Sequence, residues 1–409
     1  MEKEYWFFLE SHIYVNFKDK EMLLYDTHSG NKLLVTSSEA IQMIRKIYED
    51  KNLGSIKLTE NDVVQTAIHK FMNDVIALGM GQLIDAIQQP LKPVVLLPIL
   101  SLNLDVEKLK EKGDADLLLE RNISKYLLDV NIVLNSSCRQ SCVYCDSYYK
   151  QFFCCSKKGE YSSLTRNSIT DLLCQISYYP VHTINITGGN IYEYEALDLF
   201  QTSNESETKV FNFYIHYLNY QENPYVDAQK IHIIVNPPVD MEKFKTVHSL
   251  VRDKDVKYHL IIENIEQYNE LEMLVSEMEL KYVEIHPFYN GENGLFFEEN
   301  VYLTEEDILM RPISMREIFR NQKLNANSFG SLYILPNGDI KANLNEDTIG
   351  HLDKDRIIDV INIEMMQNTA WRKVRSSEPC KGCVYQFLCP PLSNYERAIN
   401  KQNLCHVQK

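Results

Sequence analysis

Cysteines are the residues of this chain whose spacing points most directly to chemistry. The 409-residue sequence has ten of them, five between positions 138 and 155 and four between 380 and 405, with only one outside these clusters. The N-terminus, Met1–Glu4, lacks the basic and then apolar pattern of a secretory signal peptide. In a reducing compartment, clustered thiols indicate metal binding or catalysis rather than disulfides. The sequence therefore predicts two thiol sites.

The first thiol site consists of Cys138, Cys142 and Cys145, which lie within eight residues of one another. Three thiolates alone cannot complete the four-ligand shell of a structural zinc ion. They can bind three irons of a [4Fe–4S] cluster and leave the fourth iron open to a ligand that is not protein. A structural zinc loop is the alternative for this spacing.

This cysteine segment follows the first of six predicted strands, which alternate with helical patterns. Strands are predicted at 127–134, 183–186, 210–217, 231–235, 258–262 and 282–286, and helices at 164–178, 191–200, 241–251 and 268–278. Strands that alternate with helices indicate an α/β protein with a parallel sheet, here a partial barrel.

The spacing Cys-x3-Cys-x-Tyr144-Cys, placed after the first strand, resembles that of radical S-adenosylmethionine (SAM) enzymes. The resemblance implies a partial (β/α)6 TIM-like barrel in which SAM chelates the open iron held by Cys138, Cys142 and Cys145, with Tyr144 beside the cofactor. It also implies that one electron cleaves SAM to methionine and a 5′-deoxyadenosyl radical, which abstracts a substrate hydrogen. An external donor such as flavodoxin or ferredoxin would supply that electron.

The same resemblance implies cofactor contacts at the ends of later strands. Gly188-Gly189-Asn190 follows the second strand, where the family has a Gly-Gly-Glu motif that contacts the amino group of SAM. The glycines permit close backbone approach, and Asn190 keeps a hydrogen-bond acceptor without the charge of glutamate. Asn236 and Glu263, after the fourth and fifth strands, would lie near the ribose or methionine of SAM. Solvated polar strand ends are the alternative for these two.

The second thiol site has the spacing Cys-x2-Cys-x5-Cys, followed by one more cysteine near the C-terminus. With the hairpin predicted at 335–339, this pattern resembles the SPASM domain, a C-terminal extension of peptide-modifying radical SAM enzymes that holds auxiliary clusters. Two cysteines of the fuller SPASM pattern are missing here. The resemblance therefore implies one auxiliary [4Fe–4S] cluster, held by Cys380, Cys383, Cys389 and Cys405. A structural four-cysteine zinc knuckle is the alternative, because thiolates bind both metals.

The other three cysteines are not predicted to bind metal. Cys154 and Cys155 are interpreted as packed small hydrophobic residues, or as thiols that return a hydrogen atom if the reaction is an epimerisation. Cys174 lies in an amphipathic helical pattern and is predicted to be buried.

Residues 1–90 lack cysteine and have a pattern of their own. Strands are predicted at 5–15, 22–25, 33–35 and 82–84, and two helices begin at capping signals at 36–39 and 59–62. This order predicts a winged-helix-like module and resembles the recognition element of systems that modify ribosomal peptides. The resemblance implies that a leader peptide binds as an added strand, in a groove framed by residues 14–34 and the helix from Val63. An ordinary small packed domain is the alternative.

Charge and hydropathy exclude two classes of partner. The formal net charge is −15 and no run of five basic residues occurs, so a nucleic-acid partner is not expected. The longest apolar stretch, Val94–Leu100, contains a proline and is too short to cross a bilayer. The sequence predicts a soluble cytoplasmic protein that does not bind membranes.

The predicted organisation is a leader-recognition module (1–90), a linker (91–125), a radical SAM partial barrel (126–300) and a SPASM-like auxiliary-cluster domain (301–409). The predicted function is maturation of a ribosomally made precursor peptide (RiPP) by a thioether or carbon–carbon cross-link, or by epimerisation. The alternative is an inactive pseudo-radical-SAM scaffold that presents a precursor to another enzyme. This alternative is considered because the segment Cys389–Glu396 resembles the tail of a group of SPASM proteins from gut-type (Bacteroidales-type) anaerobes. In that group of proteins the barrel is often degenerate.

Overall fold

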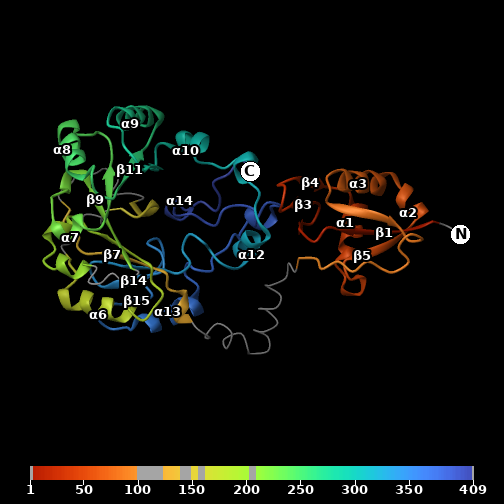
Figure 1. Cartoon of the computed structure of the whole chain (residues 1–409), viewed down its shortest axis with the longest axis horizontal. Helices are drawn as coiled ribbons and strands as arrows, with labels where there is room; N and C mark the ends of the chain where they lie inside the picture. Colours follow the sequence, from red (N-terminus) through yellow and green to blue (C-terminus); the bar gives the residue numbers. More distant parts are fainter. Residues whose placement is uncertain (1–2, 99–122, 139–148, 155–161, 202–208, 408–409) are drawn as a thin grey trace.

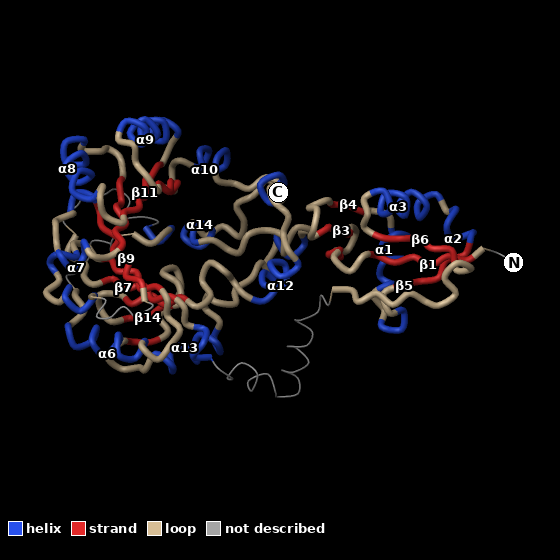
Figure 2. Tube along the Cα trace, viewed as in Figure 1, coloured by secondary structure: helices blue, strands red, loops and turns tan. Residues whose placement is uncertain are grey.

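The computed structural model describes residues 3–98, 123–138, 149–154, 162–201 and 209–407. An N-terminal module stands beside a larger body that contains a nine-stranded sheet (Figure 1). Between the strands of these two parts lies a loop-rich segment with short helices, which belongs to the C-terminal part of the chain (Figure 2).

The N-terminal module has two three-stranded antiparallel sheets. In one, β1 (Glu4–Leu9) lies between β5 (Ser55–Thr59) and β6 (Gly81–Asp85); in the other, β3 (Met22–Asp26) lies between β2 (Ile13–Phe17) and β4 (Lys32–Val35). The single strand predicted at 5–15 is wrong. A turn closed by the hydrogen bond from Ile13 N to Glu10 O (3.1 Å) puts its two halves in different sheets. Strand β5 was not predicted.

The helices of the module follow their capping signals closely. α1 (Ser38–Ile47) starts one residue later than predicted, because Ser37 rather than Thr36 is its N-cap. Thr59 and Asp62 form the predicted capping box. The helix predicted after it is two helices, α2 (Glu60–Val64) and α3 (Thr66–Ala77), because Gln65 between them has a non-helical ψ of 123°. A 3-10 turn, η1 (Asp50–Asn52), completes the module.

Six parallel strands of the large sheet follow one another in chain order, and all six were predicted. They are β7 (Asp129–Val133), β8 (Thr183–Thr187), β9 (Val210–His216), β10 (Lys230–Val235), β11 (Val256–Ile262) and β12 (Val283–Pro287). The connections include α6 (Arg166–Ile176), α7 (Pro224–Asp227), α8 (Met241–Val251), α9 (Ile265–Glu277) and the short turns η4 (Tyr149–Gln151) and η7 (Tyr217–Asn219). The turn η2 (Ile123–Tyr126) precedes β7. In Figure 1, helices α6 to α9 lie around the outside of the strands, with α7 and α8 on the side away from the N-terminal module and α9 above β11.

The helix predicted at 191–200 is wrong. Two 3-10 turns, η5 (Ile191–Glu193) and η6 (Leu197–Phe200), stand in its place. Tyr194, at the end of the first turn, is extended (φ −84°, ψ 124°) and so interrupts any continuous helix.

The C-terminal part extends the same sheet. β13 (Ser331–Ile334) pairs in parallel with β7, and β14 (Asp339–Lys341) and β15 (Gly350–His351) continue the sheet in antiparallel fashion. The predicted hairpin joins β13 to β14, with Gly338 at φ +89°. The remaining elements are α10 (Gly294–Asn300), α11 (Glu305–Ile308), α12 (Met315–Lys323), α13 (Ile357–Gln367), η8 (Cys380–Gly382) and α14 (Asn394–Ala398).

The N-terminal module docks on the segment that carries the C-terminal cysteines. Tyr14, Leu23 and Tyr25 form one apolar cluster with residues of α11, α12 and the 383–388 segment. The buried Asn16 donates to the carbonyl oxygen of Val384 at 2.7 Å. The module and the second thiol site are therefore direct neighbours.

We expect the Asn16→Ala substitution to weaken this docking. A buried carbonyl left without its donor costs about 1–3 kcal/mol, so the urea midpoint of undocking should fall. The two tryptophans, Trp6 in the module and Trp371 in the body, can each serve as a single fluorescent reporter after the other is replaced. Asn73→Ala, at an exposed position on α3 of the same module, is the control and should change stability by about 0.5 kcal/mol or less. Equal shifts in the two variants would contradict this role of Asn16.

No helix within the described residues is long and apolar enough to cross a membrane.

Candidate functional site

The two faces of the parallel sheet differ in chemistry. Side chains alternate between the faces of a strand, and one alternating set, which includes Ile184, Ile186, Ile231 and Ile233, belongs to the main hydrophobic core. The other set places at least one Asn or His in each strand, including Asn131, Asn185, Asn212, His232, His259 and His286. Parallel sheets are usually covered by apolar side chains on both faces. The polar face is therefore a candidate site.

The polar side chains form two short hydrogen-bonded rows across the strands. Asn185 donates to Asn131 at 2.8 Å, and Asn212 donates to Asn185 at 2.9 Å. In the other row, His259 is hydrogen bonded to His232 at 2.7 Å and to His286 at 2.8 Å. Neither row was predicted from the sequence. Their signal is a lone Asn or His between two apolar residues, repeated in successive strands, as in Phe211-Asn212-Phe213 and Ile231-His232-Ile233.

Of the first thiol site, the structure describes Cys138, whereas Cys142, Tyr144 and Cys145 lie outside the described residues. Cys138 is buried and comes shortly after β7 ends, and its backbone nitrogen donates to Ser136 O at 2.9 Å. Cys138 thus lies beyond the carboxyl end of a parallel strand, where open α/β sheets bind their ligands.

The glycines after β8 lie directly against this cysteine segment. A Cβ atom on Gly189 would be 2.2 Å from the backbone nitrogen of Cys138, closer than any side chain allows. Asn135 ties the two segments together, since its backbone oxygen accepts from Gly189 N (2.9 Å) and its side-chain oxygen accepts from Asn190 N (3.2 Å). The segments after β7 and β8 therefore form one unit that requires glycine at 189.

The side chain of Asn190 caps the turn that follows it. Its oxygen accepts from Tyr192 N at 3.2 Å, and its amide group donates to Glu193 at 3.4 Å. A carbonyl oxygen has two lone pairs, so Asn190 can accept a second hydrogen bond.

Asn236 and Glu263 follow the carboxyl ends of β10 and β11, as predicted. Asn236 is hydrogen bonded to His216, at the end of β9. One carboxylate oxygen of Glu263 accepts from Asn290 at 2.9 Å, while the other is buried without a hydrogen-bond partner among the described residues. Burial raises the pKa of Glu263. An unpaired buried oxygen costs free energy, which a ligand hydroxyl or amine would relieve.

The four C-terminal cysteines come together around one small cavity, which Arg375 also lines. The cysteines are Cys380, Cys383, Cys389 and Cys405. All four lie in the described part of the chain, and no three of their sulfurs are within 4.8 Å of one another. A tetrahedral zinc ion would hold its sulfurs about 3.8 Å apart. In a four-iron cluster each thiolate binds a different iron and the sulfurs lie further apart. No three of these sulfurs therefore lie as close together as a bound zinc ion would hold them.

Hydrogen-bond donors surround these sulfurs. Arg375 Nη1 lies 3.7 Å from the sulfur of Cys380, and Asn403 Nδ2 lies 3.2 Å from that of Cys405. Arg375 also forms a buried bidentate pair with Glu396, with distances of 2.7 and 3.2 Å. Burial raises the pKa of Cys389 to about 12, with Arg375 opposing it. The Cys389 thiol is thus protonated unless a metal or cluster binds, which would deprotonate it.

The remaining cysteines differ from one another. Cys154 is half-buried and packs against a small cluster of Ile234, Ile261 and Phe288, as predicted for a small hydrophobic residue. Cys155 lies outside the described residues. The prediction that Cys174 is buried is wrong: it is exposed, because α6 turns Leu172 and Ile176 inward and position 174 away from the core.

The N-terminal module has an exposed sheet edge and, elsewhere, a groove. β4 is an edge strand close to α3, and its Leu34 is 48% exposed. These two elements lie within the region for which the groove was predicted, residues 14–34 and the helix from Val63. A groove of about 710 Å³ lies elsewhere, between the end of α1 and residues 94–98, with Phe17, Tyr48 and Leu53 in its wall.

No protein-family model and no curated protein matches the sequence. Among solved structures, the chain is similar to SuiB of Streptococcus suis bound to its precursor peptide SuiA, with 12% identity and a TM-score of 0.38 over 94% of each chain. It is also similar to SuiB bound to S-adenosylmethionine, with 12% identity and a TM-score of 0.39 over 93% of this chain and 94% of that one. At this level the similarity assigns no function to the present chain.

Proposed function

We propose that this protein is a radical SAM enzyme that modifies a ribosomally made precursor peptide. The observation that carries the proposal is the contact between Gly189 and the backbone of Cys138. It brings a thiol-rich segment and a glycine-rich segment together beyond the carboxyl ends of neighbouring parallel strands, as a cofactor that spans both would require.

Cys138, Cys142 and Cys145 would hold three irons of a [4Fe–4S] cluster, with SAM on the fourth. When bound, these groups would supply the electron and the 5′-deoxyadenosyl radical that abstracts hydrogen from the substrate. Asn190 would accept a hydrogen bond from the amino group of SAM. The unpaired oxygen of Glu263 would accept one from a hydroxyl or amino group. A flavodoxin or ferredoxin would be the external electron donor.

The four C-terminal cysteines would hold one auxiliary [4Fe–4S] cluster. Their convergence on one cavity, the separation of their sulfurs and the nearby Arg375 support this assignment. A cluster there can accept the electron that a substrate radical loses when a new thioether or carbon–carbon bond forms. We therefore favour cross-linking over epimerisation, for which the half-buried Cys154 would be the hydrogen-donating thiol.

The N-terminal module would bind the leader of the precursor peptide as a strand added to the edge of β4, in the groove beside α3. An added strand gains main-chain hydrogen bonds, and side-chain pockets supply specificity. The docking of the module on the 383–388 segment supports this role, because a leader held there starts close to the auxiliary cluster site.

A scaffold that only presents the peptide is the second candidate. The uncharged Asn190 in place of glutamate, and the two cysteines missing from the SPASM-like pattern, favour it. Such a scaffold would bind a precursor peptide without cleaving SAM.

Anaerobic reconstitution with iron and sulfide, followed by dithionite and SAM, tests the proposal. We expect about eight irons per chain and formation of 5′-deoxyadenosine. Cys142→Ala should lose about half of the iron and all 5′-deoxyadenosine, and Cys405→Ala should lose iron from the second site. Cys174→Ala, at an exposed position of α6, is the matched control and should change neither. Iron without SAM cleavage, even with the precursor present, would favour the scaffold, and zinc at both sites would exclude the radical mechanism.

A further inference from the structure

Three side chains on β11 and β12 converge on one point of the polar sheet face. The ring nitrogens of His259 and His286 and a carboxylate oxygen of Glu284 lie within 4.8 Å of one another. Glu284 and His286 are two residues apart on β12 and so face the same side, and His259 is the register partner of Glu284 on β11. The three ligating groups thus come from two rigid, hydrogen-bonded strands.

The two histidine rings point their nitrogens at each other. Their centroids are 5.0 Å apart while the facing nitrogens are only 2.8 Å apart, so the rings meet edge to edge. Both ring nitrogens can therefore turn toward one ion between them. Zinc–nitrogen bonds of about 2.0–2.1 Å in a tetrahedral site need nitrogens about 3.4 Å apart. Binding would replace the hydrogen bond and require only a small rotation of each ring.

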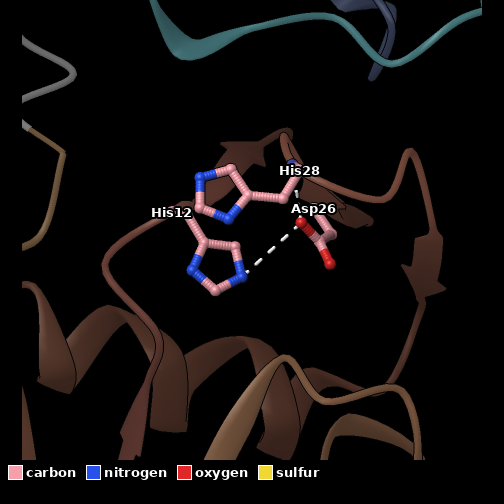
Figure 3. Close-up of side chains that lie close together, drawn as sticks. All are labelled: His12, Asp26 and His28. Carbon is pink, nitrogen blue, oxygen red and sulfur yellow. Dashed lines mark hydrogen bonds and ion pairs between the residues drawn. The ribbon is translucent and has the colours of Figure 1, made fainter.

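The other triad of this kind in the described residues lacks this geometry. His12 and His28 stack face to face, with centroids 4.2 Å apart and planes 6° apart (Figure 3). Lone pairs in the planes of parallel stacked rings do not converge. The nearby Asp26 carboxylate already accepts from His28 N, Ser29 N and Ser29 Oγ, which closes a turn. This triad is better explained as part of the turn between β3 and β4.

His232 supports His259 from the side opposite His286. It is hydrogen bonded to the second nitrogen of His259, the one that would not bind a metal, at 2.7 Å. Metal-bound histidines usually have such a partner, which fixes ring orientation and tautomer.

One cation already competes for the carboxylate. Lys257, on β11, forms an ion pair with Glu284 at 2.5 Å. The side chain of Glu284 is 46% exposed, so its carboxylate can be reached from solvent.

We propose that His259, Glu284 and His286 bind one divalent transition-metal ion of the Zn²⁺ type. Two imidazoles and a carboxylate suit zinc, iron(II) and cobalt(II). Three protein ligands leave at least one coordination position for water or for an oxygen of a bound substrate. The site lies in the same sheet as the proposed radical chemistry but uses none of its cysteines, and it stands whether or not that function holds.

Cobalt(II) is a suitable probe because its visible spectrum distinguishes imidazole and carboxylate ligands from thiolates. The full-length protein, with its cysteine sites first loaded with iron and sulfide, would be titrated against a chromophoric chelator. We expect one thiolate-free Co²⁺ site per chain, displaced by Zn²⁺. Glu284→Gln, at a partly exposed position, should weaken binding about tenfold or more, and His286→Ala should abolish it.

Two further variants distinguish a specific effect on Co²⁺ binding from general damage to the fold. Lys257→Met removes the competing ammonium, so it should tighten Co²⁺ binding about tenfold, an effect that damage to the fold would not produce. His69→Ala, at an exposed position on α3, is the matched histidine control and should leave binding unchanged. The proposal is overturned if no thiolate-free site is found, if Glu284→Gln and His286→Ala bind Co²⁺ as the wild type does, or if His12→Ala alone abolishes binding.

Discussion

Replacing Gly189 with alanine is expected to abolish the formation of 5′-deoxyadenosine. The new methyl group would stand 2.2 Å from the backbone nitrogen of Cys138 and 2.6 Å from Ser137, so the two segments must move apart. Neither neighbour is a flexible side-chain end that could turn away. A displacement of about 1 Å at a reacting centre can reduce the rate by about 100-fold. Quantifying 5′-deoxyadenosine after anaerobic reconstitution with dithionite and SAM measures the effect.

Gly294→Ala is the matched control for this substitution. A Cβ atom at Gly294 would meet no atom within 4 Å, and both glycines have φ values outside the left-handed region. The control should keep wild-type activity and iron content. If Gly189→Ala also kept them, the close contact between the two segments would have no role in holding the cofactors.

Replacing Arg375 with methionine should cause the largest loss of stability of any single change considered. Arg375 and Glu396 form an ion pair in which both side chains are less than 10% exposed. Removing one member of a buried pair leaves the other charge without compensation and costs about 3–5 kcal/mol. The variant also loses the donor to the sulfur of Cys380. We expect a lower urea midpoint and faster loss of iron from the C-terminal site.

Two variants separate this effect from a general loss of charge. Arg311→Met breaks a bidentate pair with Glu317 in which the arginine is 66% exposed, and such pairs contribute about 0–1 kcal/mol. The double variant Arg375→Met/Glu396→Leu removes both buried charges and should regain part of the lost stability. If Arg311→Met destabilised the protein as strongly as Arg375→Met, burial would not explain the effect.

Local signals in the sequence predicted much of the fold. The six parallel strands were found because each is a short apolar run between helical patterns, and the capping box of Thr59 and Asp62 marked the start of α2. Errors arose where a local turn or extended residue in the backbone interrupts a stretch whose sequence pattern is periodic. The turn after Glu10 divides one predicted strand into β1 and β2, and the extended Tyr194 divides one predicted helix into two short turns.

Only part of the candidate site could be predicted from the sequence, and the reason is physical. Cysteine spacing is local, so it identified the four C-terminal cysteines that the structure brings to one cavity. The histidine row depends on the register between strands. His232, His259 and His286 are 27 residues apart in successive pairs, and only strand pairing brings their rings together. The proximity of Gly189 to Cys138 likewise depends on how two connecting segments pack.

The pairing of β13 with β7 has a consequence for synthesis of the chain. Leu332 is the register partner of Val130, and the Asn131 side chain donates to the carbonyl oxygen of Leu332 at 3.3 Å. One edge of β7 therefore stays unpaired until the ribosome has released residue 334 of 409. An exposed strand edge can pair with another chain and promote aggregation. Because Cys138 comes shortly after β7, a metal or cluster that binds there would meet a complete sheet around it only after β13 has been synthesised.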